Sequence, residues 1–355
     1  TERSFLNMKR MSPKERVMAT LNGETPDRVP VFDMSIMVLS KLGGYQWKDV
    51  RHDAALSTAL ALDYDKKVNP DFLMGCMELG GMFLDLGIEY SAPDDNYCNV
   101  KGAYYVEPED IDSKALPDIS SSKECPLLWS TLIGKNADLY KKYQGDAMLG
   151  GTCWGPFTTA GFLRGVETFL MDIITEPDIA KKVMAKGTEY FDSIGREIMS
   201  QGSDFFNIAD PTSSGDLISG ETYEEYCVPA LHRTAKVWRD DFKRPVFLHI
   251  CGNTEVLSEQ IAGTGLDAFS ADHAVNLGAM KDKLAGRITL MGNVDPVKVM
   301  WMGKKEDILR ESKKCIDAAK EGGKYMLCTG CEIPRDTSLE NIKALFEAAD
   351  KYGRN

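Results

Sequence analysis

The chain has 355 residues, of which 43% are hydrophobic and 27% are charged, a composition that is ordinary for a globular protein with one large hydrophobic core. Its formal net charge of -12 argues against partners with a phosphate backbone and against anionic membranes, because both attract a surplus of Lys and Arg. We therefore expect no nucleic-acid partner and no membrane partner.

The ends and the cysteines of the chain indicate a compartment. The sequence has no apolar run of about 18 residues, and its start, TERSFLNMKRMSPKERV, lacks the apolar stretch of a secretory signal. The nine cysteines are an odd number in a chain too long to need disulfide bridges. We expect a soluble, cytoplasmic protein with reduced thiols, some of them buried and some available to a metal.

The first predicted element is a helix within SPKERVMATLNG. Ser12 is suited to cap its N-terminus, Pro13 to take its first position and Glu15 to complete a capping box, and Gly23 follows its end. We assign residues 1–28 to an N-terminal helical extension.

Short apolar runs recur along the rest of the chain, and long amphipathic segments separate them. We predict strands at residues 29–32, 146–151, 204–210, 245–250, 267–272, 287–293 and 324–330, and an eighth within the apolar but irregular region 66–106. Helices are expected at residues 177–200, 254–265 and 304–323. This alternation predicts parallel strands joined by crossover helices.

The number of strands distinguishes two architectures. Eight strands close a barrel, whereas six or seven form an open, doubly wound sheet. The chain length and the even spacing of the last five strands favour the barrel. We therefore predict an α/β fold in which residues 29–355 form a single (β/α)₈ TIM-barrel domain.

Metal-binding residue types follow two of the predicted strands. His249 and Cys251 come at the end of one strand, and Cys331 comes 80 residues later at the end of the last one. A strand that ends at Cys251-Gly252 allows both His249 and Cys251 to face one ion, and barrel closure brings Cys331 near them. One imidazole and two thiolates suit zinc better than magnesium or calcium, although this ligand set also suits copper or iron.

Two simpler interpretations of these cysteines stay open. A buried cysteine commonly packs as a small apolar residue without binding anything. Cys328 and Cys331 also form a C-x-x-C pair, which is typical of a redox site or of half a zinc knuckle. The position of Cys328 inside the predicted strand argues against the second interpretation.

Other polar residues also follow predicted strands, and in a barrel these positions surround the active site. As candidate catalytic residues, Asp272 and Glu332 could supply a fourth metal ligand, a hydrogen bond to His249 or a proton for a leaving group. The alternative for each is a helix cap. The remaining candidates are Asp210 and His273 for catalysis and Asn293 and Asp295 for cofactor binding.

Several segments carry a family likeness: MSPKERVMATLNGETPDRVPVF, DPTSSGDLIS, HICGNT, GNVDP and TGCEIPRDTSLENIKAL. The chain resembles the uroporphyrinogen decarboxylase superfamily over its whole length, and within it the corrinoid-dependent methyltransferase branch of the methylcobamide:coenzyme M methyltransferases. The resemblance implies a (β/α)₈ barrel and a zinc motif, H-x-C followed distantly by C, which falls on His249, Cys251 and Cys331. The G-C-x-I-P context selects Cys331 over Cys328.

The resemblance also implies a function, which is methyl transfer between a small substrate and the cobalt of a corrinoid. The corrinoid is expected on a separate partner protein, because this sequence has no D-x-H-x-x-G signature for cobalamin binding. The zinc would either activate a substrate thiol or act as a Lewis acid on the oxygen of a methyl ether.

Between these substrates the sequence favours the methyl ether, that is, O-demethylation of a methoxyaromatic compound, and a coenzyme M-like thiol is the alternative. The preference rests on an expected apolar pocket near the strand ends, with 17 methionines in the chain and with Phe32, Trp154, Phe157, Phe205 and Phe206.

Two further functions remain as alternatives. A true decarboxylase of this superfamily needs arginines after its first strand, whereas FDMSIMVLSKLGG offers Asp33 and no Arg. A structural zinc in a protein without enzymatic activity would require a fourth fixed protein ligand. The sequence is compatible with a homo-oligomer but does not indicate one.

Overall fold

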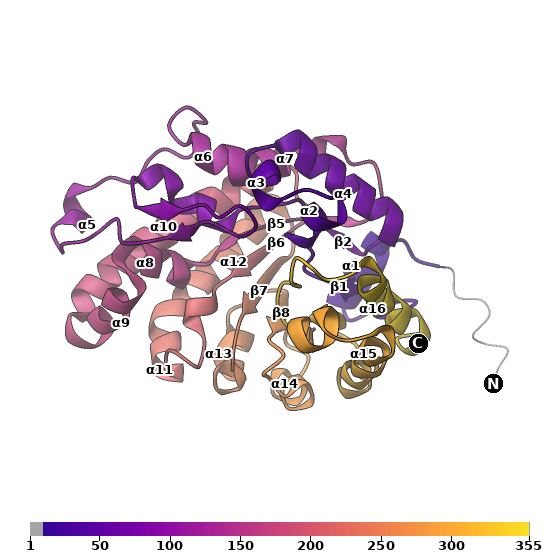
Figure 1. Ribbon diagram of the computed structural model, residues 1–355. Coiled ribbons are helices and arrows are strands. Elements are labelled where there is room, and N and C mark those ends of the chain that lie inside the picture. The colour runs from indigo at the N-terminus through magenta and orange to yellow at the C-terminus, as the bar shows by residue number, and fades with distance from the viewer. Residues whose placement is uncertain (1–9, 355) are drawn as a thin grey trace.

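A computed structural model describes residues 10–354 of the chain. Its centre is an eight-stranded parallel sheet, curved into a nearly closed barrel, with strand order β1-β10-β9-β8-β7-β6-β5-β2. Helices surround this sheet (Figure 1). The strands are β1 Val31–Phe32, β2 Phe72–Leu73, β5 Met148–Trp154, β6 Phe205–Ala209, β7 Val246–Ile250, β8 Ala268–Ala271, β9 Thr289–Val294 and β10 Tyr325–Thr329.

Helices fill the connections between the strands. Those before β5 are α1 Pro13–Leu21, α2 Val38–Leu42, α3 Trp47–Arg51, α4 Ala54–Val68, η2 Leu79–Leu86, α5 Asp110–Ser113, α6 Pro126–Leu128, η3 Trp129–Ile133 and α7 Gly134–Lys142. Those between β5 and β8 are α8 Pro156–Arg164, α9 Val166–Thr175, α10 Pro177–Ser200, η4 Pro211–Ser213, α11 Gly220–Thr222, η5 Tyr223–Cys227, α12 Val228–Phe242, η6 Glu255–Leu257 and α13 Ser258–Gly263. After β8 come α14 Leu277–Leu284, η7 Pro296–Trp301, α15 Lys305–Ala319 and α16 Leu339–Tyr352. A small antiparallel hairpin, β3 Tyr90–Ser91 with β4 Asn99–Val100, lies in the long connection after β2.

The predicted barrel is confirmed, and all seven strands that the sequence placed are present with shifted ends. The eighth strand, expected within residues 66–106, is β2, and the rest of that region includes helix η2 and the β3–β4 hairpin. The first helix is also confirmed, because the Ser12 side chain accepts from the backbone of Glu15 and the Glu15 side chain accepts from the backbone of Ser12. The division at residue 28 stays a prediction, and residues 1–9 of the expected extension lie outside the described part of the chain.

The interior of the barrel is layered, because alternate residues of each strand point inward. An aromatic cluster of Phe32, Phe72, Phe205 and Phe247 fills the lower part, with ring centroids 4.9 to 6.1 Å apart. We call this cluster the aromatic floor. The inward residues above it, toward the strand C-termini, are largely polar, and we call that end of the barrel the mouth.

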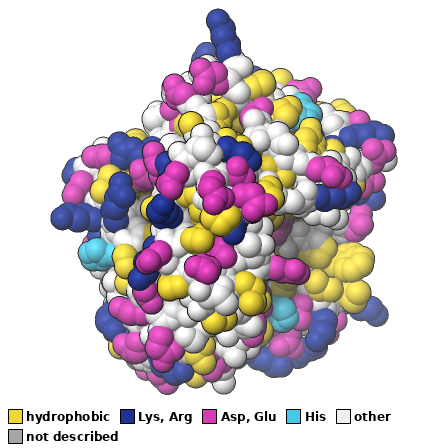
Figure 2. Space-filling model, turned by 90° about the vertical axis from the view of Figure 1, so that its left-hand side faces the viewer, with side chains coloured by type: hydrophobic (Ala, Val, Ile, Leu, Met, Phe, Trp, Pro, Cys, Tyr) yellow, Lys and Arg dark blue, Asp and Glu magenta, His cyan; other side chains and the backbone are white. Residues whose placement is uncertain are grey.

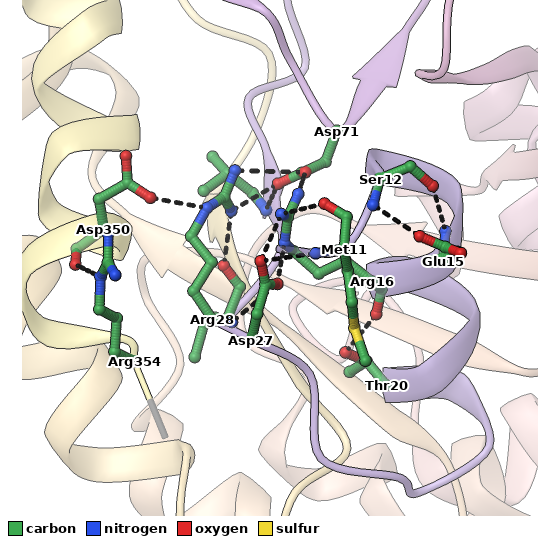
Figure 3. Close-up of polar contacts among 12 residues, drawn as sticks. Met11, Ser12, Glu15, Arg16, Thr20, Asp27, Arg28, Asp71, Asp350 and Arg354 are labelled. Carbon is green, nitrogen blue, oxygen red and sulfur yellow. Dashed lines mark hydrogen bonds and ion pairs between the residues drawn. The ribbon is translucent and has the colours of Figure 1, made fainter. Parts of the chain in front are cut away.

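The opposite end of the barrel contains a buried ionic network (Figure 3). β1 and β2 are the two ends of the strand order and form no backbone ladder with each other. Asp71, directly before β2, instead binds the Arg16 and Arg28 guanidinium groups and the backbone N–H of Val31 in β1. Arg16 also pairs with Asp27. Side chains therefore join β1 to β2 where main-chain pairing does not.

None of the helices between residues 10 and 354 combines the length and the apolar character needed to cross a membrane.

Candidate metal centre and active site

The predicted metal ligands come together at the mouth of the barrel. β7 ends at Ile250, and Gly252 adopts a left-handed backbone conformation with φ +76°, so the chain turns directly after Cys251. His249 Nε2 lies 3.3 Å from Cys251 Sγ, and Cys251 Sγ lies 3.6 Å from Cys331 Sγ. All three ligand atoms lie within 4.8 Å of one another. This arrangement fits one metal ion, because the donor set is the one that zinc prefers.

The charges of the three ligands are strongly coupled. The pKa of Cys251 is lowered, chiefly because its thiolate accepts a hydrogen bond from Cys331, and the same hydrogen bond raises the pKa of Cys331. Burial lowers the pKa of His249, but the contact with Cys331 and the charge of Asp272 raise it by more. A dication held by the three side chains would stabilise the thiolate forms of both cysteines.

Ser270 on β8 orients the histidine. The Nδ1 atom of His249 lies 3.1 Å from the Ser270 hydroxyl and 3.3 Å from its carbonyl oxygen, which leaves Nε2 directed toward the two sulfurs. The same hydroxyl lies 3.7 Å from Cys328 Sγ. Cys328 is buried within β10 and outside the three-ligand cluster, so the structure separates it from Cys331 as the sequence suggested.

Asp272 and His273 stand beside the metal ligands. The Oδ1 atom of Asp272 lies 2.8 Å from His273 Nδ1 and accepts a hydrogen bond from the backbone of Ala274. His273 is 42% exposed, and its Nε2 lies 3.8 Å from Asp295 Oδ2. These three predicted residues form a chain from the buried site to solvent. Asp295, expected to bind a cofactor, also accepts from the backbone N–H groups of Val297 and Lys298 and so caps η7.

Glu332, next to a metal ligand, is held by two partners that sequence reasoning missed. Its carboxylate accepts from the Tyr97 hydroxyl at 2.7 and 2.8 Å and from the backbone of Met37 at 2.9 Å. Burial raises the pKa of Glu332 to about 7. Tyr97 comes from the turn between β3 and β4, a region without a periodic signal in the sequence, so nothing local indicated its role.

Two other predicted residues are engaged by the fold. Asp210 is completely buried and accepts from the backbone N–H groups of Phe157 and Thr158 at the start of α8. The amide of Asn293 donates to the backbone carbonyls of Asp272 and Val275. The structure therefore places both near the mouth, but it gives them bonds that stabilise loops.

Four of the five aromatic residues on which the expected apolar pocket partly rested do not line the mouth. Phe32 and Phe205 belong to the aromatic floor, Phe206 points outward against α12, and Phe157 packs on α9. Only Trp154, half-buried at the end of β5, lies where the prediction put it.

The rim of the mouth is hydrophobic in part. Figure 2 shows the side of the molecule on which α9 and α11 lie in Figure 1. On this side, hydrophobic side chains, drawn in yellow, gather beside a hollow. Exposed apolar side chains in the segments that follow strands β6, β7 and β9 include Leu217, Val256, Val297, Trp301 and Met302.

Comparison with known proteins gives a consistent result. The family model named uroporphyrinogen decarboxylase (URO-D) matches residues 12–352. The methylated-thiol:coenzyme M methyltransferase of Methanosarcina mazei is 27% identical over 347 residues, which cover 95% of this chain and 89% of that protein. The methylcobamide:CoM methyltransferase of the same organism is 27% identical over 354 residues, covering 97% and 99%. A solved structure, a methyltransferase from Methanosarcina mazei, has a TM-score of 0.83 at 25% identity and covers 96% of this chain and 99% of its own.

Proposed function

The chain belongs to the uroporphyrinogen decarboxylase (URO-D) family, and we propose that it is a zinc-dependent methyltransferase that moves a methyl group between the cobalt of a corrinoid protein and a small thiol. The observation that carries this proposal is the cluster of His249, Cys251 and Cys331. Among residues 10–354 the cluster contains three possible ligands and not four, so one coordination position stays open for a substrate atom.

A thiol is the better substrate of the two that the sequence left open. The relatives that match along nearly the whole chain are named for coenzyme M, methylcobamide and methylated thiols. A methyl ether, the substrate favoured by the sequence, loses most of its support because all of the aromatic side chains that suggested it except Trp154 lie in the floor or pack away from the mouth. A decarboxylase that binds many carboxylates is disfavoured, because Asp33 follows β1 and is itself buried.

The chemistry follows from the charge of the ligands. A bound zinc ion favours the thiolate form of a thiol that occupies its open position. Two cysteine ligands add negative charge, which keeps a neighbouring substrate sulfur electron-rich. His249, Cys251 and Cys331 would hold the zinc, and a corrinoid carried by a partner protein would supply the methyl group, which would pass to the substrate sulfur while the electrons of the cobalt–carbon bond remain on cobalt.

The proton of the substrate thiol needs an acceptor. Asp272 is buried next to the ligands and contacts the exposed His273, so this pair offers a path from the site to solvent. We assign the proton transfer to these two residues. Glu332, held by Tyr97, has the second role of fixing the loop that carries Cys331.

The test compares Cys331→Ala with Cys328→Ala, because both remove one sulfur from the same segment but only Cys331 lies in the cluster. Zinc content is measured by elemental analysis, methylcobalamin consumption is followed with a thiol, and cob(I)alamin methylation is followed with a methoxyaromatic compound. We expect about one zinc per chain and thiol methylation in the wild type and in Cys328→Ala, and loss of both in Cys331→Ala.

Other results would change the conclusion. Zinc and activity retained in Cys331→Ala would refute the metal centre. Methylation of cob(I)alamin without any reaction of thiols would establish the methyl ether in place of the thiol. Stoichiometric zinc with neither reaction, combined with unfolding on chelation, would support a structural zinc.

A further inference from the structure

The helix η7, which follows β9 at the mouth, presents apolar side chains to solvent. Val297 is 41% exposed, Trp301 is 42% exposed and Met302 is 64% exposed. The backbone N–H of Met302 donates to the carbonyl of Val297, which closes one turn of this π-helix and places the three side chains on one face. Large apolar side chains that gather on an exposed face are typical of a surface that binds another protein.

The opposite face of η7 is fixed to the barrel. Pro296 and Met300 are buried, and Asp295 caps the start of the helix. The amide of Asn341 on α16 donates to the carbonyls of Met300 and Gly303 at 2.8 and 2.9 Å. A surface that is already held in place loses little conformational freedom when a partner binds, so the cost of binding is low.

The helix begins beside the residues that surround the metal ligands. The Oδ2 atom of Asp295 lies 3.8 Å from Nε2 of His273. Gly330, directly before the ligand Cys331, packs so closely on His273 that an added Cβ atom would lie 2.4 Å from the His273 backbone nitrogen. A protein that binds to η7 is therefore next to the entrance of the site.

The surface of η7 is cationic, although the protein as a whole is acidic. Residues 296–305 contain three lysines and no Asp or Glu, whereas the whole chain has a net charge of -12. Lys305 pairs with Glu347, but Lys298 and Lys304 are exposed and form no ion pair with any residue from 10 to 354. These two cations favour a partner with acidic side chains at the contact. The η7 patch consists of Val297, Lys298, Trp301, Met302 and Lys304.

The proposed reaction requires a large partner at this end of the barrel. The methyl group arrives on the cobalt of a corrinoid, and the sequence has no D-x-H-x-x-G signature for binding one. The interior of an eight-stranded barrel is wide enough only for side chains or one small ligand, and the aromatic floor fills its lower part. The corrinoid must therefore approach from outside the mouth, and the protein that carries it must contact the rim.

From these observations we propose that the η7 patch is the docking surface for the corrinoid protein. The partner covers Trp301 and Met302 with an apolar contact, and acidic side chains around that contact pair with Lys298 and Lys304. A second copy of the chain is the less suitable occupant, because it would block the entrance that the corrinoid has to reach. This inference rests on the proposed function, from which the partner is taken.

The test compares two methyl donors with the same thiol. Free methylcobalamin reaches the site without a docking surface, whereas the methylated corrinoid protein depends on one. The corrinoid protein is purified from the source organism and is followed by its corrinoid absorbance and by methyl transfer with the wild-type enzyme. The rate with free methylcobalamin is the reference for each variant, so a general loss of activity cancels in the ratio of the two rates. Binding of the methyl-free cob(II)alamin form is measured separately by biolayer interferometry.

Each substitution in the patch has a matched control on another face. Met302→Glu is compared with Met171→Glu, because Met171 on α9 is 57% exposed. Lys298→Glu is compared with Lys236→Glu, because Lys236 on α12 is exposed and also forms no ion pair within residues 10–354. Zinc content is measured in all four variants.

We expect the two patch variants to bind the corrinoid protein more weakly than their controls. Met302→Glu should raise the Kd and the KM for the corrinoid protein by about tenfold, because it places a charge in the apolar contact. Lys298→Glu should raise both by about threefold and should make binding less sensitive to salt. Met171→Glu and Lys236→Glu should keep the wild-type Kd and the wild-type ratio of the two rates.

Three results would overturn the inference while leaving the proposed function intact. In the first, Met302→Glu weakens binding of the corrinoid protein no more than Met171→Glu does. In the second, light scattering shows a wild-type dimer that Met302→Glu separates into monomers, which would assign the patch to a second copy of the chain. In the third, free methylcobalamin reacts but no corrinoid protein of the organism donates a methyl group. If neither donor methylates a thiol with the zinc-loaded wild type, the proposed function fails, and this inference fails with it.

Discussion

Replacing Asp71 by Asn should destabilise the whole barrel, because Asp71 joins its two unpaired edge strands. The Asp71 side chain is 0% exposed and accepts from Arg16 at 2.6 Å, from Arg28 at 2.7 Å and from the backbone of Val31 at 2.8 Å. Asparagine keeps the shape but directs an N–H₂ group at a guanidinium, and it leaves two nearly buried cations without this counter-charge. Breaking a buried ion pair costs about 3 to 5 kcal/mol.

The expected cost lies near the lower end of this range, because Arg16 keeps its bond to Asp27 and Arg28 keeps Asp350. An unfolding entropy of about 2.1 cal/mol/K per residue over 355 residues gives roughly 0.7 kcal/mol/K, so about 3 kcal/mol lowers the Tm by about 4 °C.

Differential scanning calorimetry measures this change, and Asp350→Asn is the matched control. Asp350 pairs with Arg28 at 3.0 Å but is half exposed, so its loss should cost less than about 1 kcal/mol. Zinc content should be unchanged in both variants, because the network lies at the end of the barrel opposite the metal ligands. Equal Tm values for the two variants would refute the argument that Asp71 joins β1 to β2.

Three more changes have defined outcomes. Ser270→Ala removes the hydroxyl that lies 3.1 Å from His249 Nδ1, and it should weaken zinc affinity by about tenfold in a chelator competition. An unchanged affinity would mean that the backbone carbonyl of residue 270 alone orients the imidazole ring. Burial raises the pKa of Asp210 to about 6, so the ionisation of this carboxyl lowers the free energy of unfolding as the pH rises from about 4 to 6. In urea titrations over this pH range, Asp210→Asn should lose less stability than the wild type. Parallel pH profiles for the two proteins would contradict this. Gly330→Ala should reduce zinc content, because a Cβ atom there would lie 2.4 Å from the backbone nitrogen of His273; a variant with full zinc would show that the loop can move aside.

The strand pattern made the fold predictable from the sequence, because seven of the eight strands are apolar runs bounded by turn residues. The eighth, β2, has two residues, and its apolar signal continues into η2, so periodicity could not locate it. The side-chain contacts that join β1 to β2 could not be predicted either, because they depend on residues such as Arg16 and Asp71 that are 55 residues apart in the chain.

The cluster of His249, Cys251 and Cys331 was predictable because each residue lies at or just after the end of a strand, and parallel strands in a barrel bring such positions together. The residues that form hydrogen bonds around this cluster were not predictable. Tyr97 reaches Glu332 across 235 residues from a hairpin turn, and Ser270 looks like any small residue inside a strand. The position of the aromatic side chains was mispredicted for a related reason. A phenylalanine has the same local sequence signal at either end of a strand, and only the strand register shows that Phe205 lies in the aromatic floor.

The end of the barrel around Asp71 and the mouth around His249 contain different kinds of buried polar cluster. At one end Asp71 is fully buried, and both of its oxygens accept hydrogen bonds from cations or backbone. At the mouth, two thiols lie 3.6 Å apart beside an imidazole. A metal ion held by His249, Cys251 and Cys331 would complete this cluster, and it is at this point that the structure supports the proposed methyl transfer.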